Sequence, residues 1–155
     1  MSMIPASVSI IGVLKNSQIF GCTISSLVSL NVVEPELFFV LRNGSTLLST
    51  IGHESVFSIN VLSDKQKHLA DYYSSEREIE FLATSNNPWK EANLNSIVLE
   101  NSKVSFVCQL IKREKMETST LIFCKPKIAF QSSIASPLTY SNREYFKLTK
   151  LIESK

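Results

Sequence analysis

The chain has 155 residues, of which 44% are hydrophobic and 19% are charged, and its formal net charge is +2 at neutral pH. This is the length of one domain with its own buried core, so we expect a single domain over residues 1–155 and exclude a disordered chain. The small net charge and the scattered lysines argue against a nucleic-acid partner.

Three strands are expected in the first third of the chain. Val8–Leu14 and Gln18–Ile24 are short apolar or β-branched runs, and the residues between them have the composition of a tight turn. This pattern is typical of a β-hairpin. Pro35–Arg42 is the third strand, and its unbroken apolar middle predicts burial on both faces.

A short helix is expected after the third strand. Ser45 or Thr46 stands at its N-cap position, where a hydroxyl accepts a hydrogen bond from the first helical turn. Three apolar side chains share the face that would pack on the core: Leu47, Leu48 and Ile51. The next segment, Ser55–Ser63, alternates between apolar and polar residues and predicts another strand.

A second helix is expected from the capping-box spacing of Ser63 and Gln66. Its buried stripe is predicted from helical spacing to consist of Leu69, Tyr72 and Tyr73. The polar segment that follows, Glu76–Ser96, contains the only tryptophan of the chain, Trp89. We expect this excursion to fold back on the barrel or onto a partner.

The rest of the chain returns to strand-like patterns. Three segments carry them: Lys103–Lys112, Ser119–Phe130 and Ser136–Leu148. In the first segment, alternate apolar residues from Val104 to Leu110 are expected on one face. The charged run Lys112–Lys115 is interpreted as a solvated turn.

Six or seven strands with tight turns and two or three short helices predict a mainly β fold, a closed or nearly closed antiparallel barrel. No apolar run reaches the length of a membrane span, and the N-terminus lacks the basic and small-residue signals of a secretory peptide. We therefore expect no membrane partner and a cytoplasmic location.

The cysteines and histidines do not form a recognisable metal site. Cys22, Cys108 and Cys124 are odd in number and have no C-x-x-C spacing, so we expect buried thiols rather than disulfides or zinc ligands. His53 and His68 lack paired ligand spacing and are expected at the surface.

The pentapeptide from Arg42 to Thr46 has the chemistry of an anion site. Gly44 permits a tight turn, and the N–H groups of the following helix would present partial positive charge. Arg42 would add a full charge and Asn43 a neutral hydrogen bond. The alternative is that Ser45 only caps the helix.

A second group of hydroxyls precedes this pentapeptide by one strand length. It consists of Thr23, Ser25 and Ser26. An antiparallel return would bring both groups to the same end of the barrel. A ligand with a phosphate and a hydrogen-bonding ring system would suit the combination.

Three stretches in this order resemble the flavin reductase-like family of FMN-binding split barrels. They are GCTISSLVSLNVVEPELFFVLRNGST (residues 21–46), FSINVLSDKQKHLADYYS (57–74) and PLTYSNREYFKL (137–148). The resemblance runs from about Val8 to Leu148. It implies an antiparallel split β-barrel of six or seven strands.

The resemblance also implies a function. Members of this family are homodimers that hold FMN or FAD near the subunit interface. Many pass a hydride from NADH or NADPH to the flavin, and often release reduced flavin to a separate monooxygenase. Carried over to this sequence, the resemblance places Thr23, Ser25 and Ser26 along the isoalloxazine and ribityl chain. The phosphate would meet a second set, Asn43, Ser45 and Thr46, to which the charge argument above adds Arg42.

One part of the family pattern differs. Reductases of this family commonly carry a Gly-Asp-His-Thr stretch, with the histidine near the nicotinamide, and here Thr118 and Ser119 stand in place of the aspartate and histidine. Two functions follow: an NAD(P)H-dependent flavin reductase, or a protein that holds FMN as a prosthetic group or store without efficient NAD(P)H use. The related pyridoxamine phosphate oxidase branch shares the phosphate argument but not the motif from Thr23 to Ser26.

Overall fold

The computed structural model describes residues 3–31, 33–52, 56–75, 77–80, 87–132 and 135–150. Its strands are β1 (Ala6–Ser7), β2 (Ser9–Lys15), β3 (Gln18–Ile24), β4 (Val28–Asn31), β5 (Glu36–Arg42), β6 (Val56–Val61), β7 (Arg77–Glu80), β8 (Trp89–Ala92), β9 (Ser96–Leu99), β10 (Val104–Lys115), β11 (Ser119–Gln131), β12 (Leu138–Ser141) and β13 (Glu144–Lys147). The helical elements are α1 (Thr46–Thr50), α2 (Lys67–Tyr72) and a 3₁₀ turn, η1 (Tyr73–Ser75). The expected mainly β fold with short helices is confirmed.

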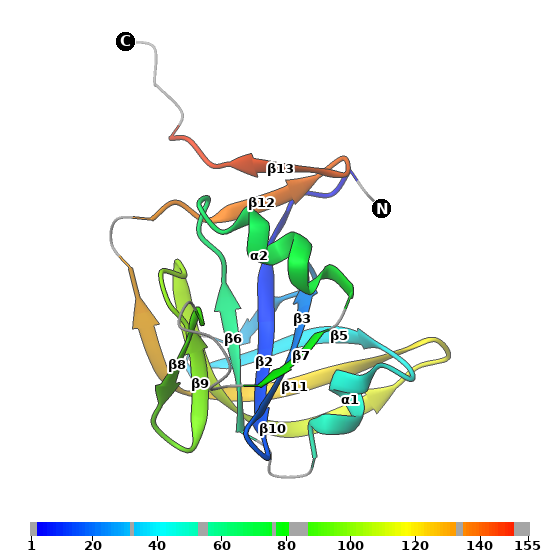
Figure 1. Cartoon of the computed structure of the whole chain (residues 1–155). Coiled ribbons are helices and arrows are strands. Elements are labelled where there is room, and N and C mark those ends of the chain that lie inside the picture. Colours follow the sequence, from blue (N-terminus) through cyan, green and yellow to red (C-terminus); the bar gives the residue numbers. More distant parts are fainter. Residues whose placement is uncertain are drawn as a thin grey trace.

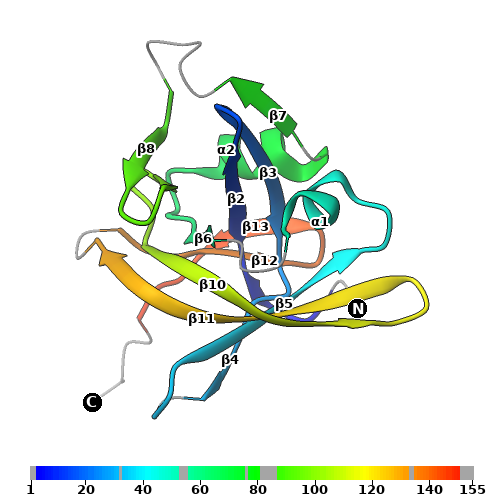
Figure 2. The same ribbon diagram turned by 90° about the horizontal axis from the view of Figure 1, so that it is seen from below.

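The main sheet is antiparallel and has eight strands in the order β4-β5-β11-β10-β6-β2-β3-β7. It curls so that β3 approaches β5 although four strands separate them in the sheet (Figure 2). A smaller sheet, β1-β12-β13, lies on the far side of α2 from the barrel (Figure 1). The curled sheet with two open edges is the expected split barrel.

The hairpin of β2 and β3 is confirmed. Its turn residues Asn16 and Ser17 have φ angles of 50° and 62°, the left-handed conformation that a two-residue hairpin turn requires at both positions. Asparagine tolerates this conformation better than most residues, which explains the turn at this point. In mid-hairpin, Gly12 stands opposite Gly21.

Two hydrophobic cores lie on the two faces of the sheet. The barrel interior contains Ile11, Phe39 and Phe57, all at most 1% exposed. The outer core, under α2 and the β8–β9 hairpin, contains Ile10 and Trp89. Strand β2 contributes alternate residues to both cores, Ile11 to the interior and Ile10 to the outer core.

One expectation about burial is wrong, and one strand buries polar residues. Strand β5 is not buried on both faces: Phe39 and its neighbours on that face are buried, whereas Phe38 and Val40 on the other face are half-buried. The alternating segment Ser55–Ser63 contains strand β6, as expected, and the polar residues on one face, Ser58 and Asn60, are buried and hydrogen-bonded to each other at 2.9 Å. The β8–β9 hairpin covers that face, and Asn60 Oδ1 accepts the Leu99 N–H at 2.9 Å.

The first helix is as predicted, and the second differs. Ser45 Oγ accepts the Leu48 N–H at 3.2 Å, so Ser45 is the N-cap of α1. In α2, Gln66 reaches back to the Ser63 N–H at 2.9 Å, which is half of a capping box, but the helix begins later, after Gln66. Tyr72, expected to be buried, is 46% exposed, and Ala70 takes its place against the core.

The segments that the sequence left open are now assigned where the structure describes them. Trp89 folds back on the barrel and is 2% exposed, so the first of the two expected positions of the excursion is confirmed for this residue. Lys112–Lys115 is not a turn: it is the exposed end of β10, paired with β11, and the chain turns only after it. Its backbone pairs with Thr120–Phe123 of β11, and its charged side chains remain exposed.

The cysteine and histidine expectations have mixed outcomes. Cys108 and Cys124 are buried free thiols, as expected, whereas Cys22 is only half-buried. His68 is exposed, and His53 lies outside the described residues. Within the described ranges, no helix combines the length and the hydropathy needed to span a membrane.

Candidate functional site

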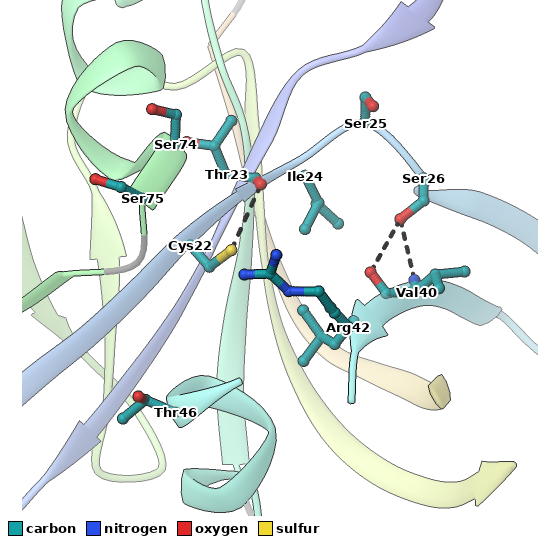
Figure 3. Close-up of a pocket in the computed structure, with 11 residues that line it drawn as sticks. Cys22, Thr23, Ile24, Ser25, Ser26, Val40, Arg42, Thr46, Ser74 and Ser75 are labelled. Atoms are coloured by element: carbon teal, nitrogen blue, oxygen red, sulfur yellow. Dashed lines mark hydrogen bonds between the residues drawn. The ribbon is translucent and has the colours of Figure 1, made fainter. Parts of the chain in front are cut away.

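An open groove of about 830 Å³ lies where the end of β3, the end of β5, the start of α1 and η1 meet (Figure 3). It gathers five of the residues singled out in the sequence: Thr23, Ser25, Ser26, Arg42 and Thr46. They come together because the curled sheet brings the C-terminal ends of β3 and β5 side by side. The sequence predicted that the cluster of Thr23, Ser25 and Ser26 would meet the Arg42–Thr46 pentapeptide, and the structure shows this meeting for these five residues.

Two of the hydroxyls also hold the walls of the groove together. Ser26 Oγ accepts the Val40 N–H at 3.0 Å and donates to the Val40 carbonyl at 3.3 Å, so it joins the loop after β3 to β5 (Figure 3). Thr23 Oγ1 donates to the Ala70 carbonyl at 2.8 Å and joins β3 to α2. Both oxygens keep acceptor capacity, but their protons are engaged within the protein.

Arg42 supplies the positive charge of the groove. It is the last residue of β5, its side chain is exposed, and Figure 3 shows it reaching from β5 toward Cys22 on β3. It forms no ion pair with any residue that the structure describes. A guanidinium without a carboxylate partner at the wall of a groove is suited to bind an anionic group.

Asn43 and Ser45 do not line this groove. Asn43 Nδ2 donates to the carbonyls of Met116 and Glu117 at 3.0 and 3.1 Å, and its Oδ1 accepts the Thr120 hydroxyl at 2.7 Å. Its side chain thus fastens the β10–β11 turn to the end of β5. The Ser45 side chain is buried and caps α1.

Among the groove residues that the sequence reasoning missed, three carry a thiol or a hydroxyl: Cys22, Ser74 and Ser75. Cys22 gave no signal because a lone cysteine in a strand is usually a small hydrophobe. The two serines form η1, and the sequence treated them only as the end of a helix. Their place in the groove depends on how α2 packs on β3, which no local pattern encodes.

The dimensions and chemistry of the groove fit a flavin mononucleotide. Its volume lies within the roughly 300–1,000 Å³ of small-molecule sites. Ile24, Val40 and Leu41 contribute apolar surface, which suits a planar ring system. The oxygens of Thr23 and Ser26 can accept hydrogen bonds from the hydroxyls of a polyol, and Arg42 suits a phosphate.

Residues 1–149 match a family model described as a flavin reductase like domain. The chain belongs to the flavin reductase family. This agrees with the resemblance drawn from the three motifs.

Individual members of the family are similar to the chain over most of its length. A protein from Acinetobacter baylyi named FMN reductase (NADH) RutF is 25% identical over 148 residues, which cover 94% of this chain and 77% of the relative. The reductase component of a FADH(2)-dependent resorcinol hydroxylase from a Rhizobium species is 24% identical, with 94% of this chain and 82% of the relative covered.

The fold is also that of solved flavin reductase structures. The crystal structure of a flavin reductase domain protein from an Arthrobacter species superimposes with a TM-score of 0.87 at 19% identity. The match covers 99% of this chain and 94% of the other. At this identity, the likeness confirms the fold.

Proposed function

We propose that the protein is an NAD(P)H-dependent flavin reductase that uses FMN, and that residues 1–155 act as one flavin-binding domain. The observation that carries this proposal is the groove in which Thr23, Ser25, Ser26, Arg42 and Thr46 meet. The name of the Acinetobacter relative supports NADH and FMN as the two cofactors. The name of the Rhizobium relative leaves FAD as the alternative flavin.

In this proposal different residues of the groove contact different parts of the flavin. Arg42 and Thr46 hold the phosphate end, and the hydroxyls of Thr23, Ser25 and Ser26 contact the ribityl chain and the ring. Asn43 and Ser45 act indirectly, because their bonds fix the end of β5 and the start of α1 from which Arg42 and Thr46 project.

The chemistry belongs to the cofactors. Bound flavin supplies the acceptor for a hydride from a reduced nicotinamide. Such a transfer requires no side-chain acid or base, so the task of the protein is to orient the two rings and to exclude water. Val40, a half-buried apolar residue that lines the groove, is suited to this task.

The position of the nicotinamide is proposed to be beside Ser119. Ser119 pairs with Arg42 across β11 and β5, so the two residues lie on the same face of the sheet, and Arg42 lines the groove. Ser119 is half-buried. A serine there offers a short neutral group in place of an imidazole, and this observation favours the second candidate function, a flavin-binding protein that uses NAD(P)H poorly.

An anaerobic titration separates the two candidate functions. The purified protein would be loaded with FMN and titrated with NADH and then with NADPH while the flavin absorbance is followed. Bleaching by either nucleotide at a catalytically useful rate supports the reductase. A protein that binds FMN tightly but keeps its absorbance would overturn the reductase and support the store or prosthetic-group function.

Ser119→His should raise the rate of anaerobic FMN reduction by the preferred nucleotide about tenfold at subsaturating concentration, the effect of one additional good contact. The imidazole adds stacking area and hydrogen-bonding capacity toward the nicotinamide. FMN affinity should not change. Stopped-flow reduction at saturating flavin measures the rate.

Thr118→His is the matched control for this prediction, because Thr118 lies in the exposed turn before β11. It should leave the reduction rate unchanged. Equal rates for the unaltered protein and Ser119→His, over a wide range of nucleotide concentration, would mean that position 119 does not govern nucleotide use.

We also propose a monooxygenase as the acceptor of the reduced flavin, and the cytoplasm as the location. The Rhizobium relative, named as the reductase component of a hydroxylase, supports the first proposal. The three free cysteines, Cys22, Cys108 and Cys124, support the second, because thiols stay reduced in that compartment.

A homodimer is proposed from the edge of the sheet next to the groove. Strand β4 is an edge strand whose four residues are all exposed, including Val28 and Leu30 at 42% and 47%. Ser25 and Ser26 lie three and two residues before the strand, so a second copy packed on β4 would also cover one side of the groove. An apolar edge strand left in water would favour aggregation.

Sedimentation equilibrium at micromolar concentration should give about twice the chain mass of 17.4 kDa. The double variant Val28→Glu and Leu30→Glu should shift the protein to the monomer, because buried unpaired carboxylates are costly at an interface. Leu94→Glu, in the exposed turn between β8 and β9, is the control and should leave the mass unchanged. A monomeric unaltered protein would contradict the proposal.

A further inference from the structure

The centre of the β2–β3 hairpin is a flat patch without side chains on its outer face. Gly12 and Gly21 stand opposite each other there, and two large aromatic rings lie against them. A Cβ atom on Gly12 would lie 2.4 Å from the indole of Trp89, and one on Gly21 would lie 2.6 Å from the ring of Tyr73. Only glycine at both positions allows this close approach.

The two rings are joined to each other. Trp89 Nε1 donates a hydrogen bond of 2.8 Å to the Tyr73 hydroxyl, and the rings meet edge to face with centroids 5.9 Å apart. Their exposed fractions are 2% and 1%. Burial raises the pKa of the Tyr73 phenol, so the hydroxyl stays neutral at neutral pH. A buried, hydrogen-bonded aromatic pair of this kind is a rigid unit.

This rigid pair is directly connected to the groove. Tyr73 is the first residue of η1, and the next two residues, Ser74 and Ser75, line the groove beside the Thr23 end of β3 (Figure 3). The turn is also bonded to helix α2, because Ser74 Oγ donates to the Asp71 carbonyl at 2.7 Å. The helix in turn is bonded to β3, because Thr23 Oγ1 donates to the Ala70 carbonyl at 2.8 Å.

We propose that Ser74 and Ser75 are two further flavin-contacting residues and that Tyr73 and Trp89 are positioning residues that hold them at the groove. The proposal rests on the proposed function, because it assumes that the groove binds a flavin. The two serines offer the hydroxyls of a third element, in addition to those of β3 and α1. Trp89, 14 residues after Ser75 in the sequence, acts only through Tyr73.

The test is a mutant cycle on FMN affinity. Tyr73→Phe keeps the ring on Gly21 but removes the hydroxyl that accepts from Trp89. We expect it to weaken FMN binding about fivefold, and the double variant Ser74→Ala and Ser75→Ala to weaken it about tenfold. If Tyr73 acts through the serines, adding Tyr73→Phe to the double variant costs nothing more. Flavin fluorescence measures each affinity.

Two measurements exclude a merely structural effect. Emission from Trp89, the only tryptophan, reports whether the indole remains buried in each variant. Ile97→Val shortens a fully buried side chain of the same outer core and should lower the melting temperature without changing FMN affinity. An equal loss of FMN affinity in Ile97→Val would overturn the positioning role.

The remaining outcomes are also decisive. Independent effects of Tyr73→Phe and of the serine changes, giving about a fiftyfold loss in the triple variant, would overturn the proposal. So would normal FMN binding by the Ser74→Ala and Ser75→Ala variant. In both cases the unaltered protein still binds and reduces FMN, and the proposed function stands. Failure of the unaltered protein to bind flavin would overturn both proposals.

Discussion

Arg42→Gln should weaken FMN binding about thirtyfold, or about 2 kcal/mol, and should change riboflavin binding less than about threefold. Arg42 is the cation of the groove, and it forms no ion pair with any described residue that would compete for the guanidinium. FMN carries a phosphate that riboflavin lacks. The difference between the two ligands therefore isolates the contact between Arg42 and the phosphate.

Isothermal titration of both ligands at two ionic strengths measures this effect. Salt should weaken FMN binding by the unaltered protein more than by Arg42→Gln, because screening acts on the charge that the variant lacks. Arg42→Lys keeps the charge and should recover most of the affinity. Arg143→Gln, in the exposed turn between β12 and β13, is the matched control. Equal losses for FMN and riboflavin would show that Arg42 does not hold the phosphate.

The fold was predictable because its signals are local. The β2–β3 hairpin follows from two short runs joined by Asn16 and Ser17, and helix α1 follows from the Ser45 cap. Each depends on residues within a few positions of each other. The mainly β class follows from several such segments, and a single shifted boundary does not change it.

Burial was less predictable because it depends on what covers each face. The alternation in β6 is that of a strand with a solvated face, yet Ser58 and Asn60 are buried because the β8–β9 hairpin lies over them. That hairpin falls in the excursion that the sequence left unassigned. The sequence does not distinguish a solvent-exposed serine or asparagine from one that is buried and hydrogen-bonded. The difference depends on whether another element covers that face of the strand.

The site was likewise predictable only in part. The sequence grouped Asn43 and Ser45 with Arg42 and Thr46 because neighbouring polar residues give no sign of which side chains face the same site. In the structure Arg42, at the end of β5, lines the groove. The Asn43 side chain instead donates hydrogen bonds to carbonyls of the β10–β11 turn. Hydroxyls from η1 were missed because the packing of α2 on β3 places them.

Gly12→Ala should destabilise the protein by about 3 kcal/mol and lower the melting temperature by about 10 °C, the upper end of what overpacking a core costs in a chain of this size. The added methyl would lie 2.4 Å from two carbons of the Trp89 indole and 3.0 Å from Ser58 Oγ. The indole has little room to move, because its nitrogen is bonded to Tyr73 and its side chain is 2% exposed. Thermal and urea unfolding measure the loss.

Gly44→Ala separates this clash from the general cost of replacing a glycine. Gly44 has a φ of +79° and no atom within 4 Å of its missing Cβ, so alanine there should cost only about 1 kcal/mol through backbone strain. Trp89→Phe removes the far edge of the indole and should reduce the cost of Gly12→Ala, since the methyl then has space. A Gly12→Ala protein that melts within about 3 °C of the unaltered one would mean that the indole slides aside, and that the glycine pair does not fix Trp89 on the sheet.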